Sequence, residues 1–323
     1  MDLRELPRDR LGRTIGQSSR SVRAYQRREH GERVRVHSGG WSLYILPRNA
    51  QFCRPCAAAN DGFMTENKRP LGGQHATDAD RISRGALTCA IGDVHGQIRK
   101  LELLLDLCGR RCAGQEMRLV FIGDYIDRGP DSRAVVELLM DLQRRKPGHI
   151  VCLRGNHEAV VLAAAQDRLH TLPGNVDMEL WLGPSGGGRQ TLASYGVRHA
   201  SKLPSEHLEW MASLPLSHDD GQRFFAHAGV HPERLLAEQE EEDLLWIREP
   251  FLSHEGSFGR LVVHGHTPVS ARIPDLRSNR LNIDTGAGYG GPVTAAIFDD
   301  RDRDPLAFLT DRGEVRWKAA SHD

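Results

Sequence analysis

Five short clusters of acidic, histidine and amide side chains recur between residues 92 and 268, most of them flanked by glycine. They are GDVHG at 92–96, GDYIDRG at 123–129, GNHE at 155–158, FAHAG at 225–229 and VHGHTP at 263–268. Carboxylate, imidazole and amide oxygen atoms together suit a pair of divalent transition ions such as Mn2+, Fe2+ or Zn2+. Two such ions about 4 Å apart can share a water molecule, lower its pKa and stabilise an in-line displacement. The clusters contain no cysteine, which argues against a closed structural zinc site.

The first three clusters each follow an apolar run that predicts a buried strand, at 87–91, 119–122 and 150–153. Between these runs, apolar residues recur at helical spacing over 98–108 and 135–142. The order strand, helix, strand, helix, strand with short connections predicts a parallel sheet with covering helices. Because open α/β sheets place their sites at the carboxyl ends of the strands, we expect these three clusters to meet at one edge. The last two clusters also follow short apolar runs that could be strands.

The composition excludes several classes of protein. The 323 residues include 43 basic and 43 acidic side chains, and this zero net charge argues against a dedicated binder of nucleic acid. No apolar run is long enough for a transmembrane helix or a secretory signal, so we expect no membrane partner. Six scattered cysteines fit reduced thiols rather than a disulfide framework. These features predict a cytoplasmic enzyme.

The amino-terminal part differs from the rest. Residues 1–63 contain twelve Arg and no Lys against six acidic residues, and they lack both helical and strand periodicity. We expect residues 1–85 to form an Arg-rich, disordered extension. Three interpretations of 1–63 stay open: a tail without a specific role, an over-extended translation with the true start at Met64, and an arm that contacts nucleic acid or another partner.

The ordered clusters resemble the phosphoprotein phosphatase family of calcineurin-like metallophosphoesterases, and most of all its bacterial serine/threonine phosphatase branch. The likeness covers about residues 86–300. It implies an α/β fold, a sandwich of two mixed β-sheets flanked by helices, with a catalytic domain over 86–323. It also implies two divalent ions, with Mn2+ expected and Fe or Zn as alternatives. The metal ligands that the family pattern implies are Asp93 and His95 for the first ion, Asp124 bridging both, and Asn156, His227 and His266 for the second.

The same resemblance assigns the remaining roles. Arg128 and, with a weaker match, Arg248 would clamp the phosphoryl oxygens, a task that suits the planar guanidinium. His157 would be the general acid that protonates the leaving oxygen, oriented by Asp127. Tyr289 would line the cleft.

Two further features of the sequence need an interpretation. On a strand, His264 would face the same way as His266, but we expect His266 alone to be a ligand. The glycine triplet at 186–188 is not followed by the residues of a phosphate-binding loop, so we expect a mobile loop between helical segments.

The predicted reaction is hydrolysis of a phosphate monoester by attack of a metal-bridging hydroxide, without a covalent phosphoenzyme, since no Cys or Ser lies in the clusters as a nucleophile. The preferred substrate is phosphoserine or phosphothreonine in a protein, or a small phosphoester. A diadenosine polyphosphate hydrolase of the same family is the alternative. A nucleic-acid-binding or scaffold protein that uses the Arg-rich arm is a third hypothesis, against which the completeness of the clusters counts.

Overall fold

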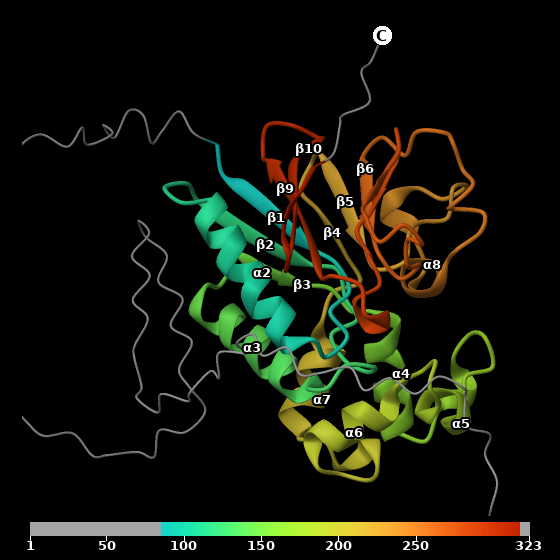
Figure 1. The fold of residues 1–323 in the computed structure, drawn as a ribbon. Helices are drawn as coiled ribbons and strands as arrows, with labels where there is room; N and C mark the ends of the chain where they lie inside the picture. The colour runs from blue at the N-terminus through green and yellow to red at the C-terminus, as the bar shows by residue number, and fades with distance from the viewer. Residues whose placement is uncertain (1–84, 317–323) are drawn as a thin grey trace, which may run out of the picture.

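Two β-sheets face each other in the computed structural model, and helices lie against their outer faces (Figure 1). The structure describes residues 85–316. The predicted extension at 1–85 therefore lies outside the described residues, except for its last residue, and so do residues 317–323.

The first sheet has six strands in the order β11-β10-β9-β1-β2-β3. Strands β1, β2 and β3 are parallel to one another, whereas β9, β10 and β11 run antiparallel to their neighbours. The three predicted strands and their parallel pairing are thus confirmed. The bounds are β1 Leu87–Ile91, β2 Met117–Phe121, β3 Ile150–Cys152, β9 Thr294–Asp299, β10 Pro305–Thr310 and β11 Gly313–Val315.

The second sheet has five strands in the order β4-β5-β6-β8-β7. Its three central strands are parallel, and the two edge strands are antiparallel. Both sheets are therefore mixed, as the predicted sandwich requires. The bounds are β4 Ser217–Asp219, β5 Arg223–Ala226, β6 Leu261–His264, β8 Arg280–Asn282 and β7 Asp275–Leu276.

Helices connect and cover the sheets. Those of the described residues are α2 Ile98–Arg111, α3 Ser132–Arg145, α4 Asn156–Ala165, α5 Met178–Leu182, α6 Gly188–Tyr195, α7 Ser205–Ser213 and α8 Glu241–Trp246. The amphipathic α2 and α3 lie beside β1, β2 and β3, and α4 to α7 gather below the strand ends (Figure 1). Within residues 85–316 no helix combines the length and apolarity needed to cross a membrane.

Alternation along the strands divides the core between the layers. In β1, Cys89 and Ile91 pack with the helices, whereas Ala90 between them packs between the sheets. In β5, Phe225 likewise lies between the sheets while Phe224 and Ala226 pack toward α8. Because successive side chains of a strand point to opposite faces, a strand buried on both faces must be continuously apolar.

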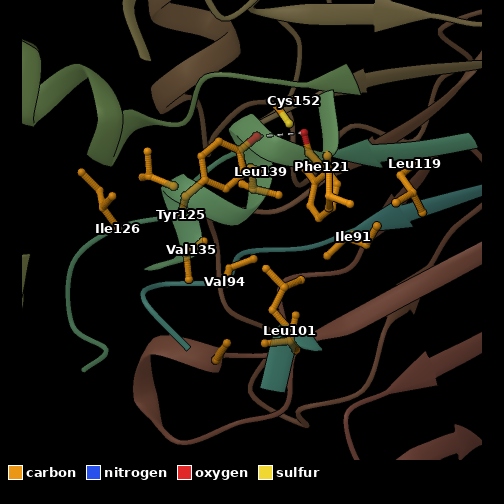
Figure 2. Close-up of a cluster of buried hydrophobic side chains, with 14 of the residues drawn as sticks. Ile91, Val94, Leu101, Leu119, Phe121, Tyr125, Ile126, Val135, Leu139 and Cys152 are labelled. Carbon is orange, nitrogen blue, oxygen red and sulfur yellow. Dashed lines mark hydrogen bonds between the residues drawn. The ribbon is translucent and has the colours of Figure 1, made fainter. Parts of the chain in front are cut away.

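The core beneath α2 and α3 anchors the strand ends that carry the polar clusters (Figure 2). Leu101 of α2 is fully buried there, and burial of such a side chain contributes about 1.5–3 kcal/mol. Tyr125, just beyond β2, donates its hydroxyl to the carbonyl oxygens of Phe121 at 3.2 Å and Leu153 at 2.6 Å. The tips after β2 and β3 are thereby tied to each other and to the core.

Candidate active site

The carboxyl ends of β1, β2 and β3 bring the first three clusters together. The backbone N–H of His95 donates to the Asp124 carbonyl at 2.8 Å, and the N–H of His157, in the first turn of α4, donates to Oδ1 of Asp124 at 3.1 Å. The first two tips approach so closely that a Cβ on Gly129 would collide with the carbonyl oxygen of His95. Glycine at this position is therefore a condition of bringing the tips together.

Left-handed backbone conformations concentrate at these tips. Eight non-glycine residues of the described chain have positive φ, and five of them are predicted site residues: His95, Asp124, Asp127, Arg128 and His266, with φ between 47° and 69°. Such conformations cost of order 1–3 kcal/mol each and persist where the surroundings enforce them, commonly at functional sites.

The second sheet supplies the two remaining predicted ligands. His227 follows β5, and its Nε2 lies 3.3 Å from Oδ1 of Asp124. His266 follows β6, and its N–H donates to Oδ2 of Asp93 at 3.2 Å. Nε2 of His227 and Nδ1 of His266 both lie 2.9 Å from Oδ1 of Asn156. All six predicted ligands therefore meet in one buried pocket.

Two groups of side chains in this pocket have the geometry to hold a cation. One is His95, Asp124 and His157, and the other is Asp93, Asp124 and His227; within each group the ligand atoms lie within 4.8 Å of one another. Asp124 belongs to both, which is what a bridging ligand must do. The first group includes His157, for which the sequence predicts a different role; its Nε2 lies 3.9 Å from Oδ2 of Asp124.

The hydrogen bonds of the imidazoles fit metal ligation. Burial lowers the pKa of both His95 and His227, so each ring is neutral and has a single N–H. Nδ1 faces a carbonyl oxygen in both rings, that of Ile126 at 2.9 Å and that of Ile122 at 3.0 Å, so the proton is on Nδ1. Nε2 of His227 then directs a lone pair at Oδ1 of Asn156, acceptor against acceptor at 2.9 Å. A cation between them would turn this repulsion into ligation.

The charges of the buried carboxylates also fit a metal site. Burial alone would raise the pKa of Asp124, but the positive charges around it outweigh burial and lower that pKa, so the carboxylate stays ionised. For Asp93 the pKa is raised by burial and then by the carboxylates of Asp284 and Asp124. Crowded buried carboxylates beside neutral imidazoles are a donor set that divalent cations would stabilise.

The predicted acid is held by a dense set of hydrogen bonds. Nδ1 of His157 donates to Oδ2 of Asp127 at 2.6 Å, which leaves Nε2 facing the pocket. Burial would lower the pKa of His157, but Asp124 and the Asp127 hydrogen bond outweigh it and raise that pKa. Two residues that sequence reasoning missed complete the set: Nε1 of Trp181 donates to Oδ2 of Asp127 at 3.0 Å and Oγ1 of Thr191 donates to Oδ1 at 2.5 Å.

The loop between α5 and α6 explains the glycine triplet. The backbone N–H of Arg128 donates to the Gly187 carbonyl at 3.1 Å, and a Cβ on Gly187 would collide with the Arg128 backbone. A Cβ on Gly188 would collide with the indole of Trp181. Gly186 and Gly187 lie between the helical segments, as expected, while Gly188 begins α6, and the triplet packs closely against Arg128 and Trp181.

Both predicted arginines face the pocket. Arg128 contacts Nε2 of His95 through Nη1, donates Nε to the Ser185 carbonyl at 3.1 Å, and places its guanidinium 4.7 Å from the ring centre of Tyr289. Tyr289 is 50% exposed, so it lies at the rim. Arg248 donates to Oγ1 of Thr267 at 2.8 Å.

Two other residues near the pocket were not interpreted correctly or fully from the sequence. Glu158 accepts the backbone N–H groups of Asp124, Tyr125 and Gly155 at 2.8–2.9 Å and so binds the second tip to the third. Its place in the GNHE cluster was the only signal. His264 ends β6 and is buried against Phe251, while His266 has turned away with φ 63°, so the two do not share a strand face.

Comparison with known proteins gives a consistent result. The model of the calcineurin-like phosphoesterase family matches residues 88–296. The serine/threonine-protein phosphatase 1 of Salmonella typhimurium is 32% identical over 64% of this chain and 89% of its own length. An asymmetrical bis(5'-nucleosyl)-tetraphosphatase of Oceanobacillus iheyensis is 28% identical over 66% of this chain and 88% of its own. Among solved structures, a metallophosphoesterase from Sphaerobacter thermophilus aligns with 73% of this chain and 90% of its own at 19% identity and a TM-score of 0.42.

Proposed function

Because the chain belongs to the calcineurin-like phosphoesterase family, whose members bind two divalent metals, we propose that it is a phosphatase that hydrolyses phosphoserine and phosphothreonine in proteins. Support comes from the similarity to a bacterial serine/threonine phosphatase over 89% of that protein. The other relative acts on dinucleotides by its name, which keeps a diadenosine polyphosphate as the alternative substrate.

Six residues would hold the two ions in this proposal. Asp93 and His95 would bind the first ion, and Asp124 would bridge both ions. The second ion would be bound by Asn156, His227 and His266. We propose Mn2+ as the native metal; Fe or Zn would suit the same carboxylate, imidazole and amide donors. When bound, the ions supply Lewis-acid stabilisation and an activated water. Elemental analysis of the purified protein tests their number and identity.

The protein's own side chains would do the remaining work. Arg128 and Arg248 bind the phosphoryl oxygens, and the carbonyl of Ser185 together with the ring of Tyr289 holds the Arg128 guanidinium in place. His157 delivers the proton on Nε2 to the leaving oxygen, while Asp127 fixes the ring through Nδ1.

One observation carries the proposal. The buried carboxylate of Asp124 belongs to both ligand groups, and it lies beside the imidazole of His157, which the carboxylate of Asp127 orients. Nε2 of His157 is 3.9 Å from Oδ2 of Asp124, so the acid and the ligand pocket share one space. This arrangement suits direct displacement at phosphorus assisted by a general acid.

The substrate class can be tested with two compounds. Purified protein is given a phosphothreonine peptide and diadenosine tetraphosphate at equal concentration, and the initial rates are compared. We expect the higher kcat/KM with the peptide. A higher value with the dinucleotide would overturn the phosphoprotein assignment and leave the phosphoesterase family unaffected.

The part that the Arg-rich arm plays in catalysis can be tested in the same assay. We propose that the catalytic domain spans 86–323 and that residues 1–63 take no part in the reaction. Deletion of 1–63 should leave kcat/KM unchanged, and a large loss would show that the Arg-rich arm contributes to substrate binding.

A further inference from the structure

Three cations from separate parts of the chain converge on one turn at the rim of the pocket. Lys100 of α2 donates to the Gly291 carbonyl at 2.7 Å, Arg312 of the β10–β11 turn to that of Gly290 at 3.2 Å, and Arg272 to that of Tyr289 at 3.3 Å. The three acceptors are consecutive residues, so they span less than about 8 Å. We call Lys100, Arg272 and Arg312 the rim cations.

The turn that they surround touches the pocket directly. A Cβ on Gly288 would lie 2.7 Å from Cδ2 of His95 and 2.7 Å from Cδ of Arg128. The ring of the next residue, Tyr289, contacts the Arg128 guanidinium, while its carbonyl accepts from Arg272. The turn that the rim cations bind is therefore in direct contact with Arg128 and His95.

The charge of this cluster is offset only in part, by the carboxylate of Asp311, which acts on Lys100. In the described part of the chain, none of the rim cations has a carboxylate oxygen within ion-pair distance, whereas exposed arginines such as Arg260 and Arg277 pair with aspartates. Burial lowers the pKa of Lys100; Asp311 opposes that shift, and Arg312 and Arg272 add to it by repulsion. The three cations thus act on one another, and an anion would relieve the repulsion.

Each rim cation also keeps donors to spare. The contacts with the turn use one donor of each side chain, and an ammonium has three and a guanidinium five. Arg272 and Arg312 are exposed and Lys100 is half-buried, so a ligand can reach them. If the three side chains only held the turn in place by hydrogen bonds, neutral donors would do as well as charged ones.

We propose that the rim cations form a second anion subsite, which binds another phosphate group of the same substrate while Arg128 holds the phosphate that reacts. The preferred substrate then carries at least two phosphates, either in the polyphosphate chain of a nucleotide or on neighbouring residues of a phosphoprotein. This inference rests on the proposed phosphoester hydrolysis at the Asp124 pocket.

The test removes two rim charges and compares substrates. The full-length variant Arg272→Gln/Arg312→Gln is assayed with p-nitrophenyl phosphate, a peptide with one phosphothreonine, the same peptide with a second phosphoserine nearby, and diadenosine tetraphosphate. Its control is Arg260→Gln/Arg277→Gln. This variant removes the same number of positive charges, but at positions just before β6 and β8 rather than at the rim. Each exposed charge is expected to contribute up to about fivefold.

We expect the double variant to lose about tenfold or more in kcat/KM on a substrate with a second phosphate, with under about a twofold change on p-nitrophenyl phosphate. The loss should shrink as ionic strength rises, because salt screens exposed charges. Loss confined to the dinucleotide identifies a polyphosphate chain as the ligand, and loss confined to the doubly phosphorylated peptide identifies a neighbouring phosphoresidue. Equal changes on all substrates, or none, would overturn the subsite. If the wild type hydrolyses none of the substrates, the proposed function itself fails.

Discussion

The two sides of the pocket are held in different ways. On the acid side, formed by Asp127, Arg128 and His157, the Asp127 carboxylate accepts from His157, Trp181 and Thr191 at 2.5–3.0 Å. On the histidine side, formed by Asn156, His227 and His266, two imidazoles share the single amide oxygen of Asn156, and their ring centres are 5.2 Å apart.

This difference separates positions that the protein fixes by itself from positions that a cation must complete. Donors and acceptors alternate on the acid side, so its geometry is stable without any ligand. On the histidine side a lone pair of His227 faces an amide oxygen, an arrangement that costs free energy until a positive charge lies between them. The acid side is therefore preorganised by hydrogen bonds, and the proposed metal would be needed to organise the histidine side.

Asp124→Asn should have the largest effect, because Asp124 contacts both sides. The amide removes the charge that we propose to hold both ions, and we expect activity to fall on the order of a thousandfold or more, with most metal affinity lost. Metal analysis and phosphate release measure the two effects. Asp219→Asn, at an exposed aspartate, is the matched control. Near-normal turnover with two bound ions would contradict the bridging role.

His157→Ala should damage the acid side alone. The variant keeps its metal but loses the proton donor, so hydrolysis of alkyl phosphates should fall by about 10²- to 10⁴-fold. Hydrolysis of p-nitrophenyl phosphate, whose leaving group needs little protonation, should fall much less. Rates with a series of leaving groups give the comparison, with His149→Ala, at a half-buried histidine outside the pocket, as control. An equal loss with both kinds of ester would rule out the general acid.

The two sides also differed in how far the sequence predicted them. The residues of the acid side follow β2 and β3, and helices of clear period separate β1, β2 and β3, so these strands and their order followed from the pattern. The second sheet is built from strands of two to four residues. No helix of clear period separates the strands that precede His227 and His266, since α8 has only six residues, so these two residues came from the family resemblance.

Trp181 and Thr191, which support the acid side by donating to Asp127, could hardly be predicted from the sequence. A lone tryptophan in a helix ordinarily indicates core packing, and Trp181 is indeed buried, but its indole N–H reaches Asp127. Only the glycine triplet indicated something unusual there, and it reflects close packing against Arg128 and Trp181. Contacts between residues 54 and 64 positions apart depend on the tertiary structure, and local patterns do not contain them.

Trp181→Phe should weaken the acid side without removing its acid. Phenylalanine keeps much of the buried ring but leaves Oδ2 of Asp127 one donor short, and loss of a hydrogen bond to a charged group corresponds to about a tenfold effect. The loss should be greater for alkyl than for nitrophenyl esters, as with His157→Ala. Trp210→Phe is the control, because its indole donates to Gln143 instead. Equal losses on both kinds of ester would indicate a general packing defect.

Addition of Zn2+ to chelated protein should give the smallest structural change, and spectroscopy can follow it. The ring of Trp246 lies 6.4 Å from that of His266, on the histidine side, whereas Trp181 belongs to the supports of the acid side. If a cation completes only the histidine side, the indole N–H resonance of Trp246 should shift on titration and that of Trp181 should stay nearly constant. Spectra of Trp181→Phe and Trp246→Phe assign the two signals. A large shift of Trp181 would mean that the metal also organises the acid side, and the contrast between the two sides would then be wrong.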